Sequence, residues 1–179
     1  DNRSTQSDWY LKAIEHAGDN NNLLAQAYIG LGNARCTDNG STQSDWYLKA
    51  IECAGEDNNI LAQAYIGLGN ARYTDSKHTR DEWYRKAIEC AGEDNNLLAQ
   101  AYIGLGNARY TDIEHTGNHE WYLKAIKHAF DNNNLLAQAY IGLGNAKYTN
   151  SEQTQDHQWY LKAIECAGED NNLLAQAYI

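Results

Sequence analysis

The chain has 179 residues, of which 42% are hydrophobic and 11% aromatic, and this composition is sufficient for a folded core. Its 24 acidic residues outnumber its 14 lysines and arginines, and the formal charge of -10 disfavours nucleic acid and anionic membrane surfaces as partners. No apolar segment approaches the roughly 20 residues that a transmembrane helix needs, so we expect no membrane insertion.

Self-similarity organises the whole chain. A segment of Trp, Tyr, one variable residue and Lys-Ala-Ile recurs with spacings of 37, 37, 38 and 38 residues, and its tryptophans are Trp9, Trp46, Trp83, Trp121 and Trp159. A fixed period of this length indicates a tandem-repeat architecture, and we expect residues 1–179 to form a single continuous array of about 4.8 repeats. Because the chain contains no methionine, we expect this array to be an excerpt of a longer one.

Each repeat contains two predicted helices, and the chain begins with the one that carries the tryptophan, here called the B helix. In its clearest copy it runs from about Thr79 to Ala91. A capping-box spacing marks its start in three copies, at Thr5 to Asp8, Thr42 to Asp45 and Thr79 to Glu82. Four glycines are expected to end it as C-terminal caps, namely Gly18, Gly55, Gly92 and Gly168. Phe130 takes their place in the fourth copy, where a left-handed cap would be strained, so that turn should differ.

The second predicted helix, here called the A helix, follows each B helix and is clearest from Asn58 to about Thr74. Its main apolar stripe has the 3.6-residue period and consists of Leu61, Ala64, Tyr65, Leu68 and Ala71. The polar run that starts at Asp57 can cap its first turn. A second apolar side with Ala62, Ile66 and Gly69 predicts that each A helix is wedged between two other helices. No strand-period alternation occurs, so we expect an all-α solenoid of stacked antiparallel helix pairs.

The segment Ala64-Tyr65-Ile66-Gly67-Leu68-Gly69-Asn70-Ala71, followed by Trp83-Tyr84-Arg85-Lys86-Ala87-Ile88, resembles the tetratricopeptide repeat (TPR) family. The Trp-Tyr-x-Lys-Ala segment is also similar to the Sel1-like relatives of that family. The resemblance extends over essentially the whole chain and implies a right-handed superhelical solenoid whose A helices line a concave groove. It further implies a non-enzymatic scaffold that binds a protein or peptide segment. The chain departs from the family in its repeat length of 37 or 38 residues instead of 34, in lacking a proline after the B helix, and in having polar Arg80 where the family has a small residue.

One stripe of the A helix remains once the core is assigned. In the first copy it consists of Gln26, Ile29, Asn33 and Thr37, which fall on a face away from the main apolar stripe. Amide side chains both donate and accept hydrogen bonds, which suits them to hold the backbone of a ligand. The candidate partner-binding residues are therefore Gln26, Asn33, Gln63, Asn70, Gln100, Asn107, Gln138 and Asn145. The alternative is that these amides bridge neighbouring A helices as a structural ladder, and the sequence leaves both interpretations open.

Other patterns favour packing over chemistry. One large aromatic per repeat is typical of a core position, and the Gly30-Leu31-Gly32 segment inside the A helix allows close helix packing. Cys53, Cys90 and Cys166 occupy equivalent positions, shared in the other copies by His16 and His128. Packed helix axes lie about 8 to 10 Å apart, too far for a metal ladder or for disulfides between repeats, so we expect packing residues.

We interpret His115 and His119 as part of a solvated loop, and the Glu15, Glu52, Glu89 and Glu165 column, with Lys127 in the fourth copy, as a solvated helix face. No catalytic arrangement or nucleotide-binding loop occurs, so we expect no enzyme, no catalytic residue, no metal and no cofactor. Four cysteines without a CxxC pair weakly favour a reducing cytoplasm, whereas glycosylation sequons at Asn2 and Asn39 leave an extracellular location possible.

A second function hypothesis comes from the near identity of the repeats. Asp57–Asp75 and Asp94–Asp112 differ at a single position, Ile60 against Leu97, whereas binding modules usually vary their groove. This uniformity favours a structural subunit of a self-assembling fibre, whose partners would be further copies of the chain. The apolar residues at the two ends of the array would then mediate head-to-tail contacts, and the candidates are Trp9, Ile14, Leu173, Leu174 and Tyr178.

Overall fold

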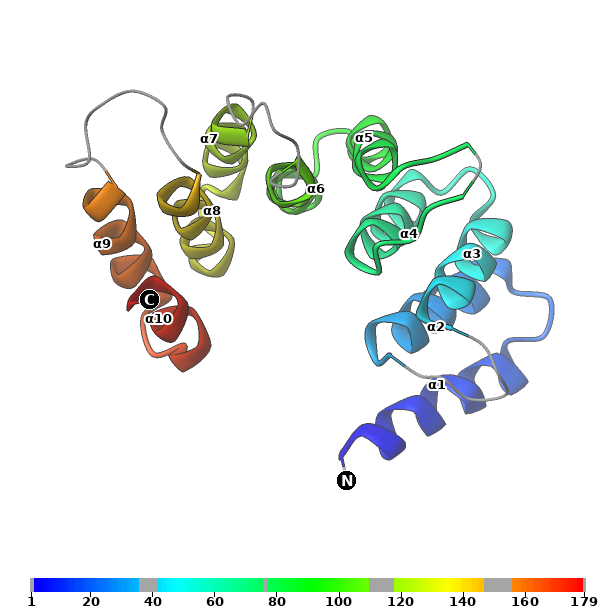
Figure 1. Ribbon diagram of the computed structural model, residues 1–179. Helices are drawn as coiled ribbons and strands as arrows, with labels where there is room; N and C mark the ends of the chain where they lie inside the picture. Colours follow the sequence, from blue (N-terminus) through cyan, green and yellow to red (C-terminus); the bar gives the residue numbers. More distant parts are fainter. Residues whose placement is uncertain (1, 36–41, 76, 110–117, 147–155, 179) are drawn as a thin grey trace. The chain divides into compact units, whose positions relative to one another are not determined.

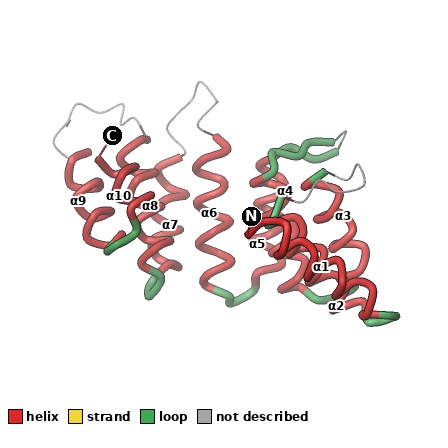
Figure 2. Tube along the Cα trace, turned by 90° about the horizontal axis from the view of Figure 1, so that it is seen from below, coloured by secondary structure: helices red, strands yellow, loops and turns green. Residues whose placement is uncertain are grey.

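The computed structural model describes residues 2–35, 42–75, 77–109, 118–146 and 156–178. Within these ranges the chain forms ten α-helices and no strand (Figures 1 and 2). The helices are α1 (Asn2–Ala17), α2 (Asn21–Asn33), α3 (Gln43–Ala54), α4 (Asn58–Asn70), α5 (Arg80–Ala91), α6 (Asn95–Arg109), α7 (Asn118–Ala129), α8 (Asn133–Asn145), α9 (Asp156–Ala167) and α10 (Asn171–Tyr178). The predicted all-α class is confirmed, with B helices at odd numbers and A helices at even numbers.

The helices belong to two compact units. Residues Asp1–Gly92 with α1 to α5 form the first unit, and residues Glu93–Ile179 with α6 to α10 form the second. In each unit, consecutive helices pack against one another, and successive A helices also touch. This packing is that of a helical repeat. A single continuous array over residues 1–179 stays a prediction.

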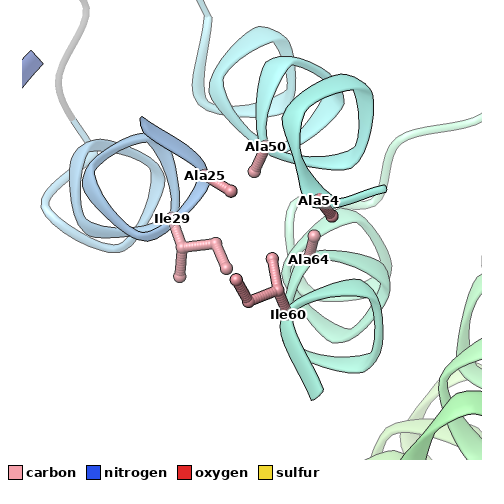
Figure 3. Packing of buried hydrophobic residues seen from close by; sticks show 6 residues of the cluster. All are labelled: Ala25, Ile29, Ala50, Ala54, Ile60 and Ala64. Atoms are coloured by element: carbon pink, nitrogen blue, oxygen red, sulfur yellow. The ribbon is translucent and has the colours of Figure 1, made fainter. Parts of the chain in front are cut away.

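The core of each unit consists of small and branched side chains where three helices meet. Ala25 and Ile29 of α2, Ala50 and Ala54 of α3, and Ile60 and Ala64 of α4 point toward one another (Figure 3). In the second unit, the equivalent cluster joins α6, α7 and α8 and consists of Ala99, Ile103, Ala125, Ala129, Leu135 and Ala139. A third cluster of the same kind joins α8, α9 and α10. These clusters confirm that the A helices are wedged between neighbours, because they bury more than one side.

The Gly-Leu-Gly segment of the A helices packs against tyrosine rings of the B helices. A Cβ atom placed on Gly32 of α2 would lie 2.6 Å from the Tyr47 ring, and one on Gly67 of α4 would lie 2.3 Å from the same ring. Both distances are far shorter than a van der Waals contact, so only glycine allows this approach. Tyr47 is thus held between two A helices, and its hydroxyl donates a hydrogen bond to Oδ1 of Asn33 over 2.8 Å.

The predicted caps of the B helices are present at Thr42 and Thr79. The Asp45 backbone N–H donates to Oγ1 of Thr42 over 3.3 Å, and the Thr42 N–H donates to the Asp45 carboxylate over 2.6 Å. Thr79 and Glu82 form the same reciprocal box. At the other end of the B helices, the four predicted glycine caps have φ values between 54° and 57°, whereas Phe130 is outside the left-handed region, so its turn differs as predicted.

Two predicted helix boundaries are wrong. The predicted helix start at Thr5 is wrong, because α1 begins at Asn2 and Thr5 lies inside the helix. Arg3 stands where the second repeat has Gly40, and arginine favours the helix by about 1 kcal/mol relative to glycine, so the helix extends toward the N-terminus.

The predicted end of the A helix near Thr74 is also too late, since α4 ends at Asn70. The Arg72 N–H donates to the Gly69 carbonyl over 3.2 Å, and the Tyr73 N–H donates to the Leu68 carbonyl over 3.0 Å. These two bonds are the Schellman motif, in which the residue after the C-cap is left-handed. Arg72 takes that conformation with φ of 56°, a role for which the sequence offers no glycine.

Candidate interaction site

A groove of about 960 Å³ opens in the first unit between α1, α2 and α4. The α1 wall is formed by Tyr10, Ala13, His16 and Ala17, and the A helices contribute Leu23, Gln26, Ala27, Ile29, Asp57, Asn59, Ile60 and Gln63. One part of the groove is therefore apolar and lies on α1 and α2, while the other part is rich in amides and lies on α2 and α4.

The amide part contains two of the predicted partner-binding residues. Gln26 and Gln63 are exposed, and their side-chain amides donate to Asn22 Oδ1 over 2.5 Å and to Asn59 Oδ1 over 2.6 Å. Asn22 in turn donates to the Asp57 carboxylate over 2.9 Å and so joins α2 to α4. In the second unit, Gln138 donates to Asn134 in the same way, and Gln100 is exposed. The glutamines thus present donors and acceptors at the surface of neighbouring A helices.

The predicted asparagines are arranged differently from the glutamines. Each accepts a hydrogen bond of 2.7 to 2.8 Å from a B-helix tyrosine hydroxyl, and the pairs are Tyr47 with Asn33, Tyr84 with Asn70, Tyr122 with Asn107 and Tyr160 with Asn145. These asparagines are exposed but do not line the groove. These bonds thus join each asparagine to the following B helix, and not to a neighbouring A helix as the ladder interpretation expects. A role of the asparagines in binding stays a prediction.

The other members of the predicted stripe do not form an exposed face with the amides. The isoleucines are buried between helices, at Ile29, Ile66, Ile103 and Ile141. Thr74 is exposed beyond the end of α4, and Thr37, Thr111 and Thr149 lie outside the described residues. The stripe is therefore divided, because its isoleucines are buried and α4 ends before its threonine.

The apolar part of the groove was not predicted from the sequence. The residues at the equivalent positions of the second repeat are buried. Leu23 is 50% exposed, whereas Ile60 at the equivalent position is 4% exposed. Ala13 is exposed and its equivalent Ala50 is fully buried. In the second repeat, side chains of α2 cover these positions (Figure 3). We call the apolar part of the groove, formed by α1 and α2, the apolar seat. A position-by-position alignment of the first repeat with the second could have predicted it from the sequence.

The five predicted end residues divide into exposed and packed ones. Trp9 is 69% exposed and Tyr178 is 73% exposed. Ile14 packs beside Leu31 and Trp46 inside the first unit. Leu173 and Leu174 pack in the cluster of α8, α9 and α10, with Leu173 buried. Trp9 and Tyr178 are therefore the two of the five that a second molecule can reach without unfolding either unit.

All five tryptophans were predicted to be core residues, and this is confirmed for Trp46 and Trp83. Trp46 and Trp83 are about 5% exposed, and they stack on Tyr28 and Tyr65 of the preceding A helices with ring centroids 5.9 and 5.7 Å apart. Trp121 and Trp159 are half-buried, and they stack in the same way on Tyr102 and Tyr140. The exposed Trp9 is the exception.

The remaining candidate chemistry has ordinary surroundings. Cys53, Cys90 and Cys166 are half-buried free thiols, and burial raises the pKa of Cys90 and Cys166, which favours their neutral form. The predicted glutamate column is exposed, as is Lys127. His119 lies in α7 and is half-buried, so its placement in a solvated loop was wrong, and burial lowers its pKa. His115 lies outside the described residues.

In the part of the chain that the structure describes, no three or more His, Cys, Asp or Glu side chains are grouped so that they could hold a metal ion. None of the described helices has the length and apolar character to cross a membrane. No protein-family model matches the chain, and no curated protein matches it in sequence.

Proposed function

We propose that the chain is a non-enzymatic helical-repeat scaffold that mediates protein–protein interaction through its A helices. In this proposal its repeats of 37 or 38 residues stack as a right-handed, TPR-like superhelix. The observation that carries the proposal is the groove of the first unit, where exposed A-helix glutamines flank an apolar seat. Apolar contact supplies affinity, and flanking amides fix the register of a bound backbone.

The occupant that suits this groove is an amphipathic helix. The apolar seat on α1 and α2 has the same residue pattern as the surface of α3 and α4. In the structure, the helix α2 packs on that surface of α3 and α4. An A helix covers Ala50 and Ile60 with one alanine and one isoleucine, Ala25 and Ile29. A helix with a small residue and, four positions later, a branched residue should therefore also pack against Ala13 and Leu23.

A peptide titration tests this proposal. The probe is a fluorescein-labelled peptide with the sequence of residues 94–111, and the control is a peptide of the same composition in scrambled order. We expect saturable binding of the probe and none of the control. Lys at Leu23 would place an unpaired charge in the apolar seat, so Leu23→Lys should weaken binding by about tenfold or more.

The matched control variant is Leu161→Lys, since Leu161 is 60% exposed on α9 and lies outside the groove. This variant should bind the probe as the parent does. Absence of saturable binding by the folded parent, or equal weakening by both lysine variants, would contradict a helix seat in the first unit.

A second candidate function is a structural subunit of a fibre, formed by continuous or head-to-tail stacking of repeats. The near identity of successive repeats favours it. Negative-stain imaging of concentrated protein separates the two candidates. Filaments favour the fibre, and discrete particles of one size favour the scaffold.

A further inference from the structure

We propose that Lys86 is a site of covalent acylation, at which the lysine amine takes the acyl group of a thioester after passing a proton to His78. A chain of side chains in hydrogen-bond contact runs from Asp75 through His78 to Lys86 and forms the site. It lies in the first unit, where the connection between α4 and α5 meets α5. None of these three residues lines the groove, so the site is independent of the proposed scaffold function.

The contact between Lys86 and His78 joins an amine to a base. Lys86 Nζ lies 2.7 Å from His78 Nε2, which is hydrogen-bond distance. A lysine ammonium only donates hydrogen bonds, so His78 Nε2 is the acceptor in this contact and carries no proton. The proton of the neutral imidazole is then on Nδ1, which lies 3.2 Å from both carboxylate oxygens of Asp75. The lysine proton therefore points at a base that can take it.

Asp75 orients the histidine and favours its charged form. Its carboxylate accepts the backbone N–H groups of Lys77 and His78 over 2.7 Å each, which holds it beside the imidazole ring. The Lys77 backbone hydrogen bond is the largest cause that lowers the pKa of Asp75, and the His78 contacts add to it. When the lysine proton moves to His78, the positive charge comes next to this carboxylate. Asp75 thus stabilises the state in which Lys86 is a neutral amine, and it is a positioning residue.

The Trp83 ring supports the imidazole from one side. The centroids of the two rings are 4.3 Å apart, at an interplanar angle of 32°. Trp83 is 4% exposed, and its Nε1 donates to the Tyr73 carbonyl over 3.0 Å, so this support is fixed in the core. The side chain of His78 is 22% exposed, and Lys86 is half-buried. The base is therefore held in place, while a small reagent can still reach the amine.

The equivalent lysines of two other repeats have partners that stabilise their charge. Lys49 Nζ lies 4.3 Å from the centroid of its tryptophan ring. Lys124 Nζ lies 4.4 Å from its tryptophan ring and 2.8 Å from the Glu120 carboxylate. Lys86 Nζ is further from its ring, at 5.1 Å. Aromatic faces and carboxylates both favour the ammonium, whereas the His78 nitrogen can accept its proton, so the acceptor distinguishes Lys86 from these two lysines.

The reaction at this site is acyl transfer without a change of oxidation state. The Lys86 ammonium gives one proton to His78 Nε2, and the free amine attacks the carbonyl carbon of the thioester. A C–N bond forms, the C–S bond breaks, and the thiolate leaves with the second amine proton. The products are an amide at Lys86, a thiol and a protonated His78, which returns its proton to water. Because the amide is stable in water, the chain is modified once and does not turn over.

Competition between two lysines of one molecule tests the proposal. The folded chain is treated with a limiting amount of phenyl thioacetate, then unfolded and fully acetylated with deuterated acetic anhydride. Cleavage after arginine leaves Lys86 as the only lysine of residues 86–109 and Lys49 as the only lysine of residues 36–72. The undeuterated fraction of each peptide, measured by mass spectrometry, gives the reactivity of its lysine in the folded chain. We expect Lys86 to exceed Lys49 by about tenfold or more, since a positioned base accelerates proton transfer.

Lys49 is a matched control within the same chain. Both lysines are half-buried, and each lies beside a buried tryptophan. A cysteine follows each lysine by four residues, Cys53 and Cys90, so acyl transfer from a neighbouring thiol would affect both lysines alike. The second repeat lacks the base, because residues 17–77 contain no histidine. Equal reactivity of the two lysines in the parent would overturn the proposal.

Two substitutions at His78 separate a base from a structural hydrogen bond. His78→Gln keeps an acceptor for the lysine but cannot take up a proton at neutral pH. His78→Ser introduces the residue that the second repeat has at this position, Ser41. Both variants should lower the reactivity of Lys86 to about one to two times that of Lys49, because the base is lost. A structural role alone would leave His78→Gln at the parental ratio, and that result would contradict proton transfer to His78.

Asp75→Asn tests the positioning role of the carboxylate. Asparagine can accept the same two backbone N–H groups, so the turn is kept while the charge is lost. We expect the ratio of Lys86 to Lys49 reactivity to fall about threefold or more, and an unchanged ratio would contradict the stabilisation of a charged His78.

His157→Gln is the matched control substitution, since His157 is exposed on α9 in the second unit. This variant should keep the parental ratio, and far-UV circular dichroism should confirm that all variants fold. A fall in the ratio as large as that of His78→Gln would overturn the assignment of the base.

Discussion

The tyrosine that is held between two glycines allows a sharp test of how tightly the repeats pack. In Gly67→Ala the added Cβ atom would lie 2.3 Å from Cε1 of the Tyr47 ring. Tyr47 is 2% exposed, and Gly32 lies close on the opposite helix, so the ring cannot move away without a shift of α2 or α4. The substitution should therefore overpack the core.

Three contributions decide the size of the effect. Overpacking of a well-packed core costs about 1 to 3 kcal/mol. Displacement of the Tyr47 ring also breaks its hydrogen bond to Asn33, which is worth about 1 kcal/mol. Replacement of glycine by alanine inside a helix gains about 1 kcal/mol. We expect a net loss of about 1 to 3 kcal/mol in the free energy of unfolding.

The first repeat provides a matched control. A Cβ atom on Gly30 would also lie 2.3 Å from a tyrosine ring, that of Tyr10. Tyr10 is only partly buried and lies beside the groove, so its ring can swing away. Gly30→Ala should therefore cost about 1 to 2 kcal/mol less than Gly67→Ala, since its overpacking can relax.

Urea unfolding monitored by far-UV circular dichroism, at the lowest protein concentration that gives a signal, measures both variants. A Gly67→Ala variant as stable as Gly30→Ala, or more stable than the parent, would refute the reasoning. The double variant Tyr47→Leu with Gly67→Ala adds a thermodynamic cycle, because removal of the ring should remove most of the penalty.

The remaining predictions concern the tryptophan column, titration and the thiols. Trp83→Ala should lower the free energy of unfolding by about 3 to 5 kcal/mol, and a loss under about 1 kcal/mol in urea would show that the column is not core. Burial raises the pKa of Tyr84, so the unfolded chain loses this proton first and stability should fall above about pH 10; Tyr84→Phe should flatten that fall in urea midpoints measured against pH. The Thr79 backbone and side-chain hydrogen bonds lower the pKa of Glu82, so its contribution is present above the usual glutamate pKa and is lost on acidification, and Glu82→Gln should reduce the acid dependence of the thermal midpoint. A chelator or a reductant should leave the thermal midpoint unchanged, and a clear drop with either would contradict the packing role of Cys90.

Period and composition were sufficient to predict the helix pairs, because each buried position repeats with its neighbours. The capping boxes at Thr42 and Thr79 follow from local hydrogen bonding and were predicted correctly. The end of the A helix was not, because the left-handed residue after it is Arg72 instead of glycine. Tertiary packing of Leu68 and Tyr73 in one cluster accompanies that turn, and such packing is not visible in a local pattern.

The candidate site was predicted in part. The glutamines lie at the surface of the A helices, as the 3.6-residue period requires for residues opposite the core. The asparagines lie at the surface too, but the sequence did not reveal that a tyrosine hydroxyl on the next helix binds each one. Tyr47 and Asn33 are 14 residues apart, and their contact depends on the glycines that let the ring approach. A spacing rule within one helix contains no information on that approach.

Exposure in this chain is set by neighbours more than by residue type. Trp9 and Trp46 begin the same segment of the repeat, yet one is 69% exposed and the other 5%. The difference arises because α2 places Tyr28 on Trp46, while no described helix of the first unit places a tyrosine on Trp9. The same reasoning applies to Tyr178, whose equivalents in the array stack on tryptophans. The burial of a tryptophan or tyrosine in this repeat therefore depends on whether its stacking partner lies on a neighbouring helix of the same unit.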